Sequence, residues 1–189
     1  METKDSLFIS AIKSGLIIGA VSIVIFFLMY VADIKPVGFL IPILTGLGSI
    51  AISIVLLVIL FKKFRTTNGG FISFRDAFLY CFIALSVSVL LSSLITNLFI
   101  FLIEPGYYKS IMDAQKVWME TNWASKMSEE QMTQTLDKLD EQAAKMGSFK
   151  YILKNLLFSI IGSGIIALIV GAIMKKNPDL FENTSGGVI

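Results

Sequence analysis

Four long stretches without a charged residue are the feature that most constrains this 189-residue chain, and they cover residues 14–32, 36–61, 77–103 and 155–174. A helix rises about 1.5 Å per residue, so about 20 apolar residues are enough to cross the ~30 Å hydrocarbon layer of a membrane. A buried helix in a soluble core could explain one such run. Four of them leave too little polar surface to dissolve the protein, so we predict an integral membrane protein.

The four stretches and their flanks predict an all-α, polytopic membrane protein that forms a single domain over residues 1–189. We expect four transmembrane helices and one helical segment outside the membrane: spans at about 10–32, 36–61, 74–103 and 152–174, and the segment 104–151 between the last two. A cleaved signal peptide is the alternative for the first span, but its exit lacks a small-x-small cleavage pattern. Pro36 suits the first turn of the second helix, and the short linker 33–35 predicts a tight hairpin.

Basic residues in short loops indicate the cytoplasmic side of a membrane protein. The loop between the second and third stretches carries four of them: Lys62, Lys63, Arg65 and Arg75. The fourth stretch ends on Lys175 and Lys176. We therefore predict that both termini and this loop are cytoplasmic. The same four loop residues are candidates for contact with anionic lipid headgroups, which attract each juxtamembrane cation by ~1 kcal/mol. The simpler explanation for these basic residues is that they only set the orientation of the helices in the membrane.

Small residues recur every four positions in all four predicted spans, which places them on one face of each helix. The faces are formed by Ala11, Gly15 and Gly19; by Thr45, Ser49 and Ser53; by Ala84, Ser88, Ser92 and Thr96; and by Ser159, Ser163, Ala167 and Gly171. Small residues let membrane helices approach closely. We therefore predict a compact four-helix bundle, although one of these faces could instead form a homo-oligomer.

The polar segment between the third and fourth spans carries clear helix signals. Ser128 followed by Gln131 is a capping box, and Gly147 stands where a helix commonly ends. Apolar residues recur at helical spacing before and after Ser128, which predicts an extracytoplasmic helical hairpin with two facing apolar stripes. The residues of these stripes that could instead contact a partner protein are Ile111, Trp118, Met132 and Leu136. Residues 104–106, Glu-Pro-Gly, either interrupt the third helix or only kink it.

Residues that usually perform catalysis or bind metals are scarce. The chain contains no histidine, and its one cysteine, Cys81, lies in an apolar run. Asp33, Asp76 and Glu104 border the spans on different sides, so we do not expect them to form one acid-base site. We expect no catalytic residue, no metal, no cofactor and no enzyme activity. The net charge of +2 is too small to suggest a nucleic-acid partner.

The basic loop runs into Asn68-Gly69-Gly70-Phe71-Ile72-Ser73-Phe74 and then into Arg75-Asp76-Ala77-Phe78. With Tyr151-Ile152-Leu153-Lys154-Asn155 and the closing Lys175-Lys176, this segment resembles the uncharacterised membrane proteins grouped as domain of unknown function 4199, found mainly in Bacteroidota. Many members have Gly where this chain has Arg75. The resemblance implies four helices in a bacterial inner (cytoplasmic) membrane. It supplies no catalytic residue.

Two functions remain open from the sequence. The first is a non-enzymatic structural or accessory subunit that contacts the lipid bilayer and, through its outer hairpin, a partner protein or a second copy. The second is a small oligomeric transporter or channel, with the small-residue faces along a path. The hairpin stripes favour the first hypothesis. The charge-free spans argue against a proton-coupled pump, which would need a carboxylate within the membrane.

Overall fold

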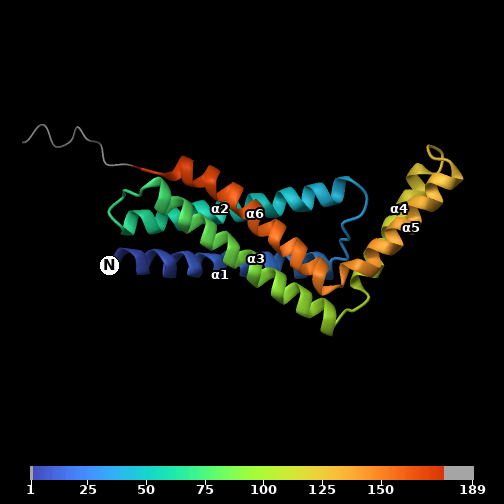
Figure 1. The fold of residues 1–189 in the computed structure, drawn as a ribbon, viewed down its shortest axis with the longest axis horizontal. Helices are drawn as coiled ribbons and strands as arrows, with labels where there is room; N and C mark the ends of the chain where they lie inside the picture. The colour runs from blue at the N-terminus through green and yellow to red at the C-terminus, as the bar shows by residue number, and fades with distance from the viewer. Residues whose placement is uncertain (1, 177–189) are drawn as a thin grey trace, which may run out of the picture.

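The computed structural model describes residues 2–176, and all extended regular structure within them is helical. Its six helices are α1 (Glu2–Val31), α2 (Leu40–Thr67), α3 (Phe74–Leu102), α4 (Tyr107–Trp123), α5 (Glu129–Met146) and α6 (Phe149–Met174). Helices α1, α2, α3 and α6 are long and apolar enough to cross a membrane, which confirms the predicted fold class. These four run lengthwise, and α4 and α5 project together from one end (Figure 1).

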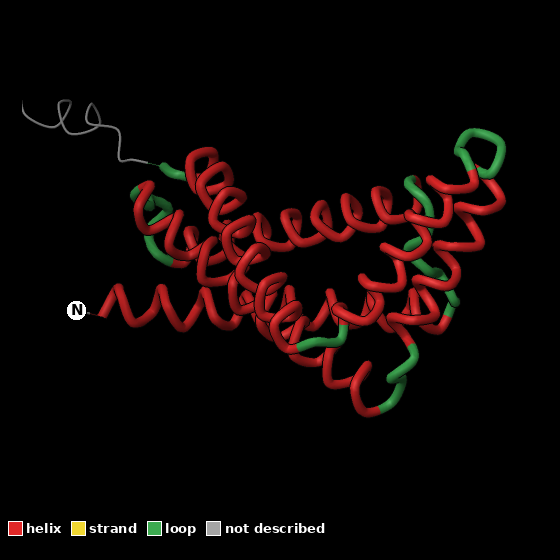
Figure 2. Tube along the Cα trace, turned by 45° about the vertical axis from the view of Figure 1, so that its right-hand side comes forward, coloured by secondary structure: helices red, strands yellow, loops and turns green. Residues whose placement is uncertain are grey.

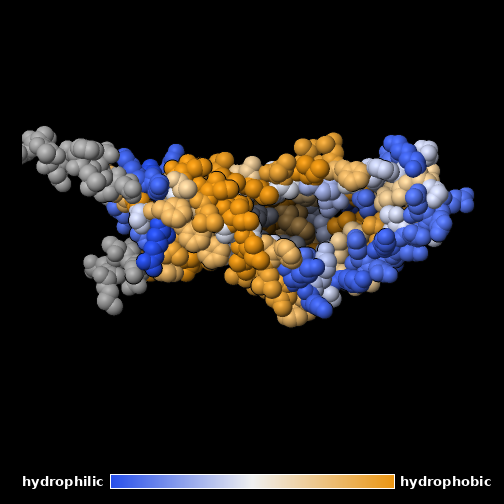
Figure 3. All heavy atoms as spheres, turned by 45° about the horizontal axis from the view of Figure 1, so that its top comes forward, coloured by the Kyte–Doolittle hydropathy of each residue, from blue (hydrophilic) through white to orange (hydrophobic). Residues whose placement is uncertain are grey.

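The molecule has two polar ends with an apolar surface between them (Figure 3). We call one of them the basic end: there α2 is joined to α3 by the loop 68–73, and α6 finishes before Lys175 and Lys176. We call the opposite end, where α3 leads into α4, the α4–α5 end. This distribution of polar residues is what a bilayer requires, because apolar side chains face lipid and charged ones stay in water.

Glycines bring α3 into close contact with both α1 and α6. A Cβ atom added to Gly15 in α1 would lie 2.5 Å from the carbonyl oxygen of Ala84. A Cβ added to Gly171 in α6 would lie 3.0 Å from the backbone nitrogen of Phe78. Real Cβ atoms essentially never show the distance at Gly15, and the distance at Gly171 is tighter than nearly all real Cβ contacts. Helix α3 is therefore the central helix, and the glycines of the predicted small-residue faces of α1 and α6 pack against it.

Helix α2 departs from the compact four-helix bundle that the small-residue pattern predicted. Its buried residues are Leu57 and Phe61, both in the half near the basic end. The predicted face includes Ser49 and Ser53, whose hydroxyls donate to backbone carbonyls of α2 itself at 2.8 Å each. These hydroxyls are therefore not available to donate to another helix. Figure 2 shows α2 running apart from its neighbours toward the α4–α5 end.

Backbone and side-chain contacts join α2, the following loop and α6 at the basic end. The backbones of Ile72 and Lys176 exchange two hydrogen bonds, of 2.9 and 3.1 Å. Arg65 donates from Nη1 to the carbonyl oxygen of Met174 at 2.9 Å. A cation at the last carbonyls of a helix is favourable because the helix dipole is negative there. The contacts hold the basic end together while the other half of α2 remains apart.

The linker between α1 and α2 is longer than predicted. Helix α2 begins at Leu40, so the expectation that Pro36 would lie in its first turn was wrong. Gly38 has a φ of +75°, which a helix does not allow, and a Cβ there would lie 2.8 Å from the ring of Trp118. Its backbone N–H donates to Oε1 of Gln115 at 2.7 Å. The linker is thus fixed against α4.

Helices α4 and α5 lie side by side (Figure 2). Residues 104–106 interrupt the third helix and do not merely kink it, because α3 ends at Leu102 and α4 begins at Tyr107. The predicted capping box is confirmed: Ser128 Oγ accepts from the N–H of Gln131, and the Gln131 side chain accepts from the N–H of Ser128. The ammonium of Lys116 in α4 pairs with the carboxylate of Asp140 in α5.

Candidate functional site

A cavity of about 320 Å³ lies between the four membrane helices, midway along their length. Each of α1, α2, α3 and α6 contributes to its wall. Its polar lining consists of seven serines: Ser22, Ser49, Ser53, Ser88, Ser92, Ser159 and Ser163. Figure 3 shows that the apolar surface is hollowed between the two polar ends. We call this space the serine cavity.

The hydroxyls of the serine cavity present oxygen lone pairs. Ser22 donates its hydrogen to the carbonyl of Ile18 at 3.0 Å, and Ser163 donates to the carbonyl of Ser159 at 2.9 Å. Ser49, Ser53 and Ser92 make the same bond four residues back. A hydroxyl has one hydrogen and two acceptor lone pairs, so these five keep acceptors for a ligand. The cavity is therefore rich in acceptors and carries no formal charge in its wall.

The serine cavity follows directly from the spacing of the small residues. Positions four apart share one helix face, so Ser88 and Ser92 in α3 line up, as do Ser159 and Ser163 in α6. Six of the seven serines belong to the predicted small-residue faces. Ser22 was missed, although it lies three residues after Gly19 and so continues the face of α1. The faces were predicted to pack together along their length; their glycines do so, whereas their serines surround a space.

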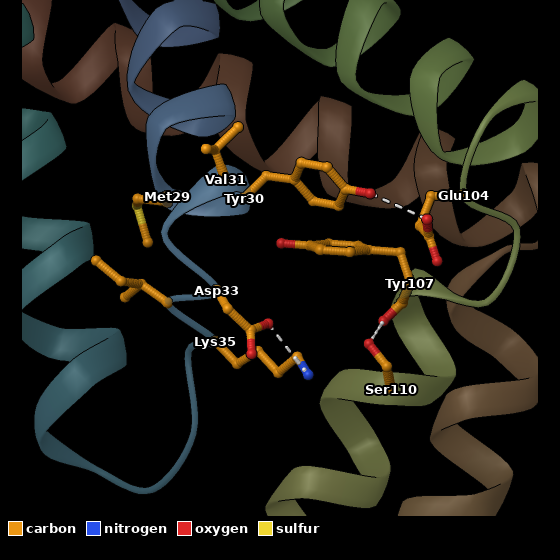
Figure 4. Close-up of a pocket in the computed structure, with 9 residues that line it drawn as sticks. Met29, Tyr30, Val31, Asp33, Lys35, Glu104, Tyr107 and Ser110 are labelled. Atoms are coloured by element: carbon orange, nitrogen blue, oxygen red, sulfur yellow. Dashed lines mark hydrogen bonds and ion pairs between the residues drawn. The ribbon is translucent and has the colours of Figure 1, made fainter.

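A second pocket, of about 390 Å³, lies at the α4–α5 end (Figure 4). Tyr30 of α1 donates from its hydroxyl to Oε2 of Glu104 at 3.0 Å. In the linker, Lys35 Nζ lies 3.3 Å from Oδ1 of Asp33. Two carboxylates and one ammonium give this pocket a net negative charge. Asp33 and Glu104 therefore share one pocket, which Asp76, the third carboxylate bordering the spans, does not line.

Aromatic side chains lie between the two sites along α1. Phe26 and Phe27 follow Ser22 by about one helical turn, and Tyr30 follows them by another. The ring of Phe99 in α3 lies 5.0 Å from Phe27 and 5.0 Å from Tyr30, in edge-to-face contacts. Such pairs add about 0.5–1.5 kcal/mol beyond their burial. They form an aromatic cluster between the serine cavity and the pocket at the α4–α5 end.

Tyr107 begins α4 and lines the second pocket. Its ring lies 6.0 Å from that of Tyr30, and its carbonyl accepts a hydrogen bond of 2.9 Å from the hydroxyl of Ser110. Burial raises the pKa of Tyr107, so its phenol stays neutral at physiological pH. The charge of the pocket therefore comes from its carboxylates and its lysine.

The four residues predicted to contact lipid headgroups all lie at the basic end, in different surroundings. Lys62 and Arg75 are exposed. Arg65 is half-buried and bonds to the end of α6. Lys63 lines a further pocket together with Lys13 of α1. Sequence reasoning missed Lys13, and the available signal was its position directly before the first charge-free stretch.

The four residues predicted as a partner surface are involved in packing within the chain. Ile111 is buried, with 8% of its surface exposed. Trp118 stacks edge-to-face on Phe39 of the linker, with ring centres 5.4 Å apart. Met132 and Leu136 are half-buried. The two stripes therefore contribute to holding α4, α5 and the linker together.

Comparison with known proteins gives one match. The model of the family described as "Protein of unknown function (DUF4199)" matches residues 13–176, which include the whole of both sites. No curated protein and no solved structure matches the chain.

Proposed function

The chain belongs to the DUF4199 family of proteins of unknown function, and on that premise we propose that it is a non-enzymatic membrane protein that passes a small solute through the serine cavity. The observation that carries the proposal is the gathering of seven serines from four helices around one space within the apolar part of the molecule. The selectivity of a path through a membrane protein depends on its width and on the hydrogen-bond donors and acceptors that line it, and the serine hydroxyls would supply such acceptors.

The chemistry of the wall selects the solute. Lone pairs without formal charge favour a hydrogen-bond donor or a monovalent cation, and disfavour an anion. A volume of about 320 Å³ is far larger than the ~10–15 Å³ that a single water needs. The solute therefore fits together with part of its hydration. Passage requires binding that is weak enough to be released, which neutral hydroxyls provide better than a carboxylate would.

The pocket at the α4–α5 end supports a cationic solute. Its carboxylates, Asp33 and Glu104, outnumber its one ammonium, Lys35, so it raises the local concentration of cations. The aromatic cluster of Phe27, Tyr30 and Phe99 lies between this pocket and the serine cavity. In the proposal, the cluster is a barrier that opens when the solute moves between the two sites.

Location and orientation are part of the same proposal. The basic end lies in the cytoplasm and the α4–α5 end outside, because positive charges in short loops favour the cytoplasmic side. The resemblance to proteins of Bacteroidota favours the inner membrane of a bacterium. Self-association through the open side of α2 would close the serine cavity toward lipid.

An accessory subunit is the second candidate, and the observation in its favour is the unpartnered half of α2. The stripes that motivated the prediction, represented by Ile111 and Trp118, are occupied by contacts within the chain. Deletion of residues 107–147 tests the form of this role that the sequence predicted, in which the partner binds through α4 and α5. An accessory subunit that binds through α4 and α5 would lose its co-purifying partners in the deletion variant.

Cation flux into liposomes tests the proposed transport. Purified protein is reconstituted, and the uptake of K⁺, Na⁺ and ammonium is compared with that of empty liposomes. The variant Ser49→Val with Ser53→Val removes two acceptors from α2, where no helix packs closely. We expect its flux to fall about tenfold or more, since hydrogen bonds to charged groups contribute about 1.5–3 kcal/mol each.

The matched control is Thr66→Val, also in α2. Thr66 donates to the carbonyl of Lys62 at 3.0 Å, so the same kind of bond is lost outside the cavity. We expect its flux to equal that of the unmodified protein. Flux no greater than in empty liposomes for every solute tested, or an equal loss in Thr66→Val, would contradict the proposal.

A further inference from the structure

A pocket of about 350 Å³ opens between α1 and α2 at the basic end. Lys13 projects into it from α1, and Lys63 from α2. The floor is formed by a buried hydrogen bond of 2.7 Å between the hydroxyls of Ser14 and Tyr80. This pocket is separate from the serine cavity, which none of these four residues lines.

The two lysines give the pocket a positive charge that no lining residue balances. No carboxylate belongs to its wall, and among the described residues neither lysine forms an ion pair. Thr67 and Asn68 also line it, and both donate to carbonyls of their own helix. The donors that the wall keeps for a ligand include the two ammonium groups and the second N–H of the Asn68 amide. This set fits an oxyanion such as a phosphate group.

The position of the pocket along the helices adds an apolar requirement. Lys13 directly precedes the first charge-free stretch, and Lys63 follows the end of the second by two residues. Both cations therefore lie where the apolar layer meets the headgroups. Leu60 and Phe64 form the apolar side of the pocket. A ligand that has a phosphate and, next to it, hydrocarbon matches both parts of the wall.

We propose that the pocket between α1 and α2 binds the phosphate of an anionic phospholipid, with Lys13 and Lys63 as its two cationic contacts. An anionic headgroup is preferred over a zwitterionic one, because the described wall offers no carboxylate to an ammonium group. The lipid would rest against Leu60 and Phe64, and it would fill the space between α1 and α2 at the basic end. The inference does not depend on solute transport.

Lipid titration of the purified full-length protein tests the site. Phosphatidylglycerol is added in non-ionic detergent, and the lipid-bound fraction is measured by native mass spectrometry. Lys13→Gln and Lys63→Gln are each expected to weaken binding about fivefold, and the double variant about 25-fold, from the attraction of single juxtamembrane cations. Lys13→Arg and Lys63→Arg are expected to retain binding, which separates loss of charge from loss of fold.

Lys62→Gln is the matched control, because it removes the same charge one residue away from Lys63 without altering the pocket wall. We expect a clearly smaller loss of affinity than that of Lys63→Gln, because Lys62 does not line the pocket. A loss as large as that of Lys63→Gln would overturn the proposal in favour of general surface attraction.

Inorganic phosphate and phosphatidylcholine distinguish the possible sources of the phosphate. We expect phosphatidylcholine to bind at least fivefold more weakly than phosphatidylglycerol. We also expect millimolar inorganic phosphate not to displace the lipid. Equal binding of both lipids would overturn the preference for an anionic headgroup. Displacement by free phosphate would overturn the assignment to a lipid. Flux through the serine cavity is a separate measurement, so failure of either proposal would leave the other standing.

Discussion

Gly15 and Gly171 show how single residues determine which helices touch. The backbone of α3 leaves no room for a Cβ at Gly15 and very little at Gly171. In lipid no hydrophobic force draws helices together, so close packing has to provide the association. The serines of the predicted small-residue faces behave differently, because hydroxyls such as those of Ser49 in α2 and Ser92 in α3 bond to their own helices. Glycine therefore creates contact here, while serine lines a space.

Gly15→Ala is expected to destabilise the protein. The new Cβ would lie 2.5 Å from the carbonyl oxygen of Ala84, so α1 has to move away from α3. Overpacking of this kind costs about 1–3 kcal/mol. Thermal unfolding in detergent should show a lower Tm. Gly46→Ala in α2 is the control, because a Cβ there meets no atom within 4 Å, and its Tm should be unchanged or higher. Equal Tm values for the two variants would be evidence against close packing of α1 on α3.

At the scale of elements, α2 and the α4–α5 pair are the least enclosed parts of the molecule. Helix α2 is held near Leu57 and Phe61, and by Arg65 on the end of α6. Its other half is attached through the linker, where Gly38 and Phe39 contact α4. We therefore expect α2 to pivot about its fixed half.

Distances between spin labels test the pivot of α2. One pair, Leu47 in α2 and Leu94 in α3, samples the open half; the other, Ile59 in α2 and Ile173 in α6, samples the held half. All four side chains are exposed, so labels should not disturb packing. We expect a broad distance distribution for the first pair in lipid nanodiscs and a narrow one for the second. Two equally narrow distributions would mean that α2 is fixed along its whole length.

The pairing of α5 with α4 should depend on alkaline pH through Lys116. The carboxylate of Asp140 accepts a hydrogen bond from Lys116 and raises its pKa above the ordinary value of 10.5. The charge of a cation with a raised pKa stabilises the folded state at all lower pH and is lost as pH rises through that pKa. Contact between α5 and α4 should therefore weaken above pH of about 10.5.

Tryptophan fluorescence can follow this change, because both tryptophans of the chain, Trp118 and Trp123, belong to α4. Lys116→Arg is the control, since arginine keeps its charge at this pH and tyrosine ionisation affects both proteins alike. We expect a fluorescence change in the unmodified protein beyond that of Lys116→Arg. Identical titrations would show that the ion pair does not hold α5.

At the scale of the whole molecule, the sequence predicts the helices well and their arrangement less well. A long stretch without charged residues predicts a membrane helix because a helix needs that length to cross the hydrocarbon layer. The helix start at Ser128 can also be predicted, because the two residues that form its capping box, Ser128 and Gln131, are close in the sequence. The start of α2 could not be predicted, because it depends on the contact of Gly38 with Trp118, far along the chain. The joining of Asp33 and Glu104 in one pocket likewise depends on tertiary structure.

The serine cavity is the feature on which the proposed function rests, and its hydration can be measured by cysteine accessibility. Ser53→Cys places a thiol in the cavity wall, and Val55→Cys places one two residues along α2, with 57% of the native side chain exposed toward lipid. The native thiol of Cys81 is fully buried, so it adds little background. A charged methanethiosulfonate reagent reacts only with thiols that meet water. We predict rapid modification of Ser53→Cys and none of Val55→Cys; failure of Ser53→Cys to react would show that the cavity is dry and would contradict the proposed passage of a polar solute.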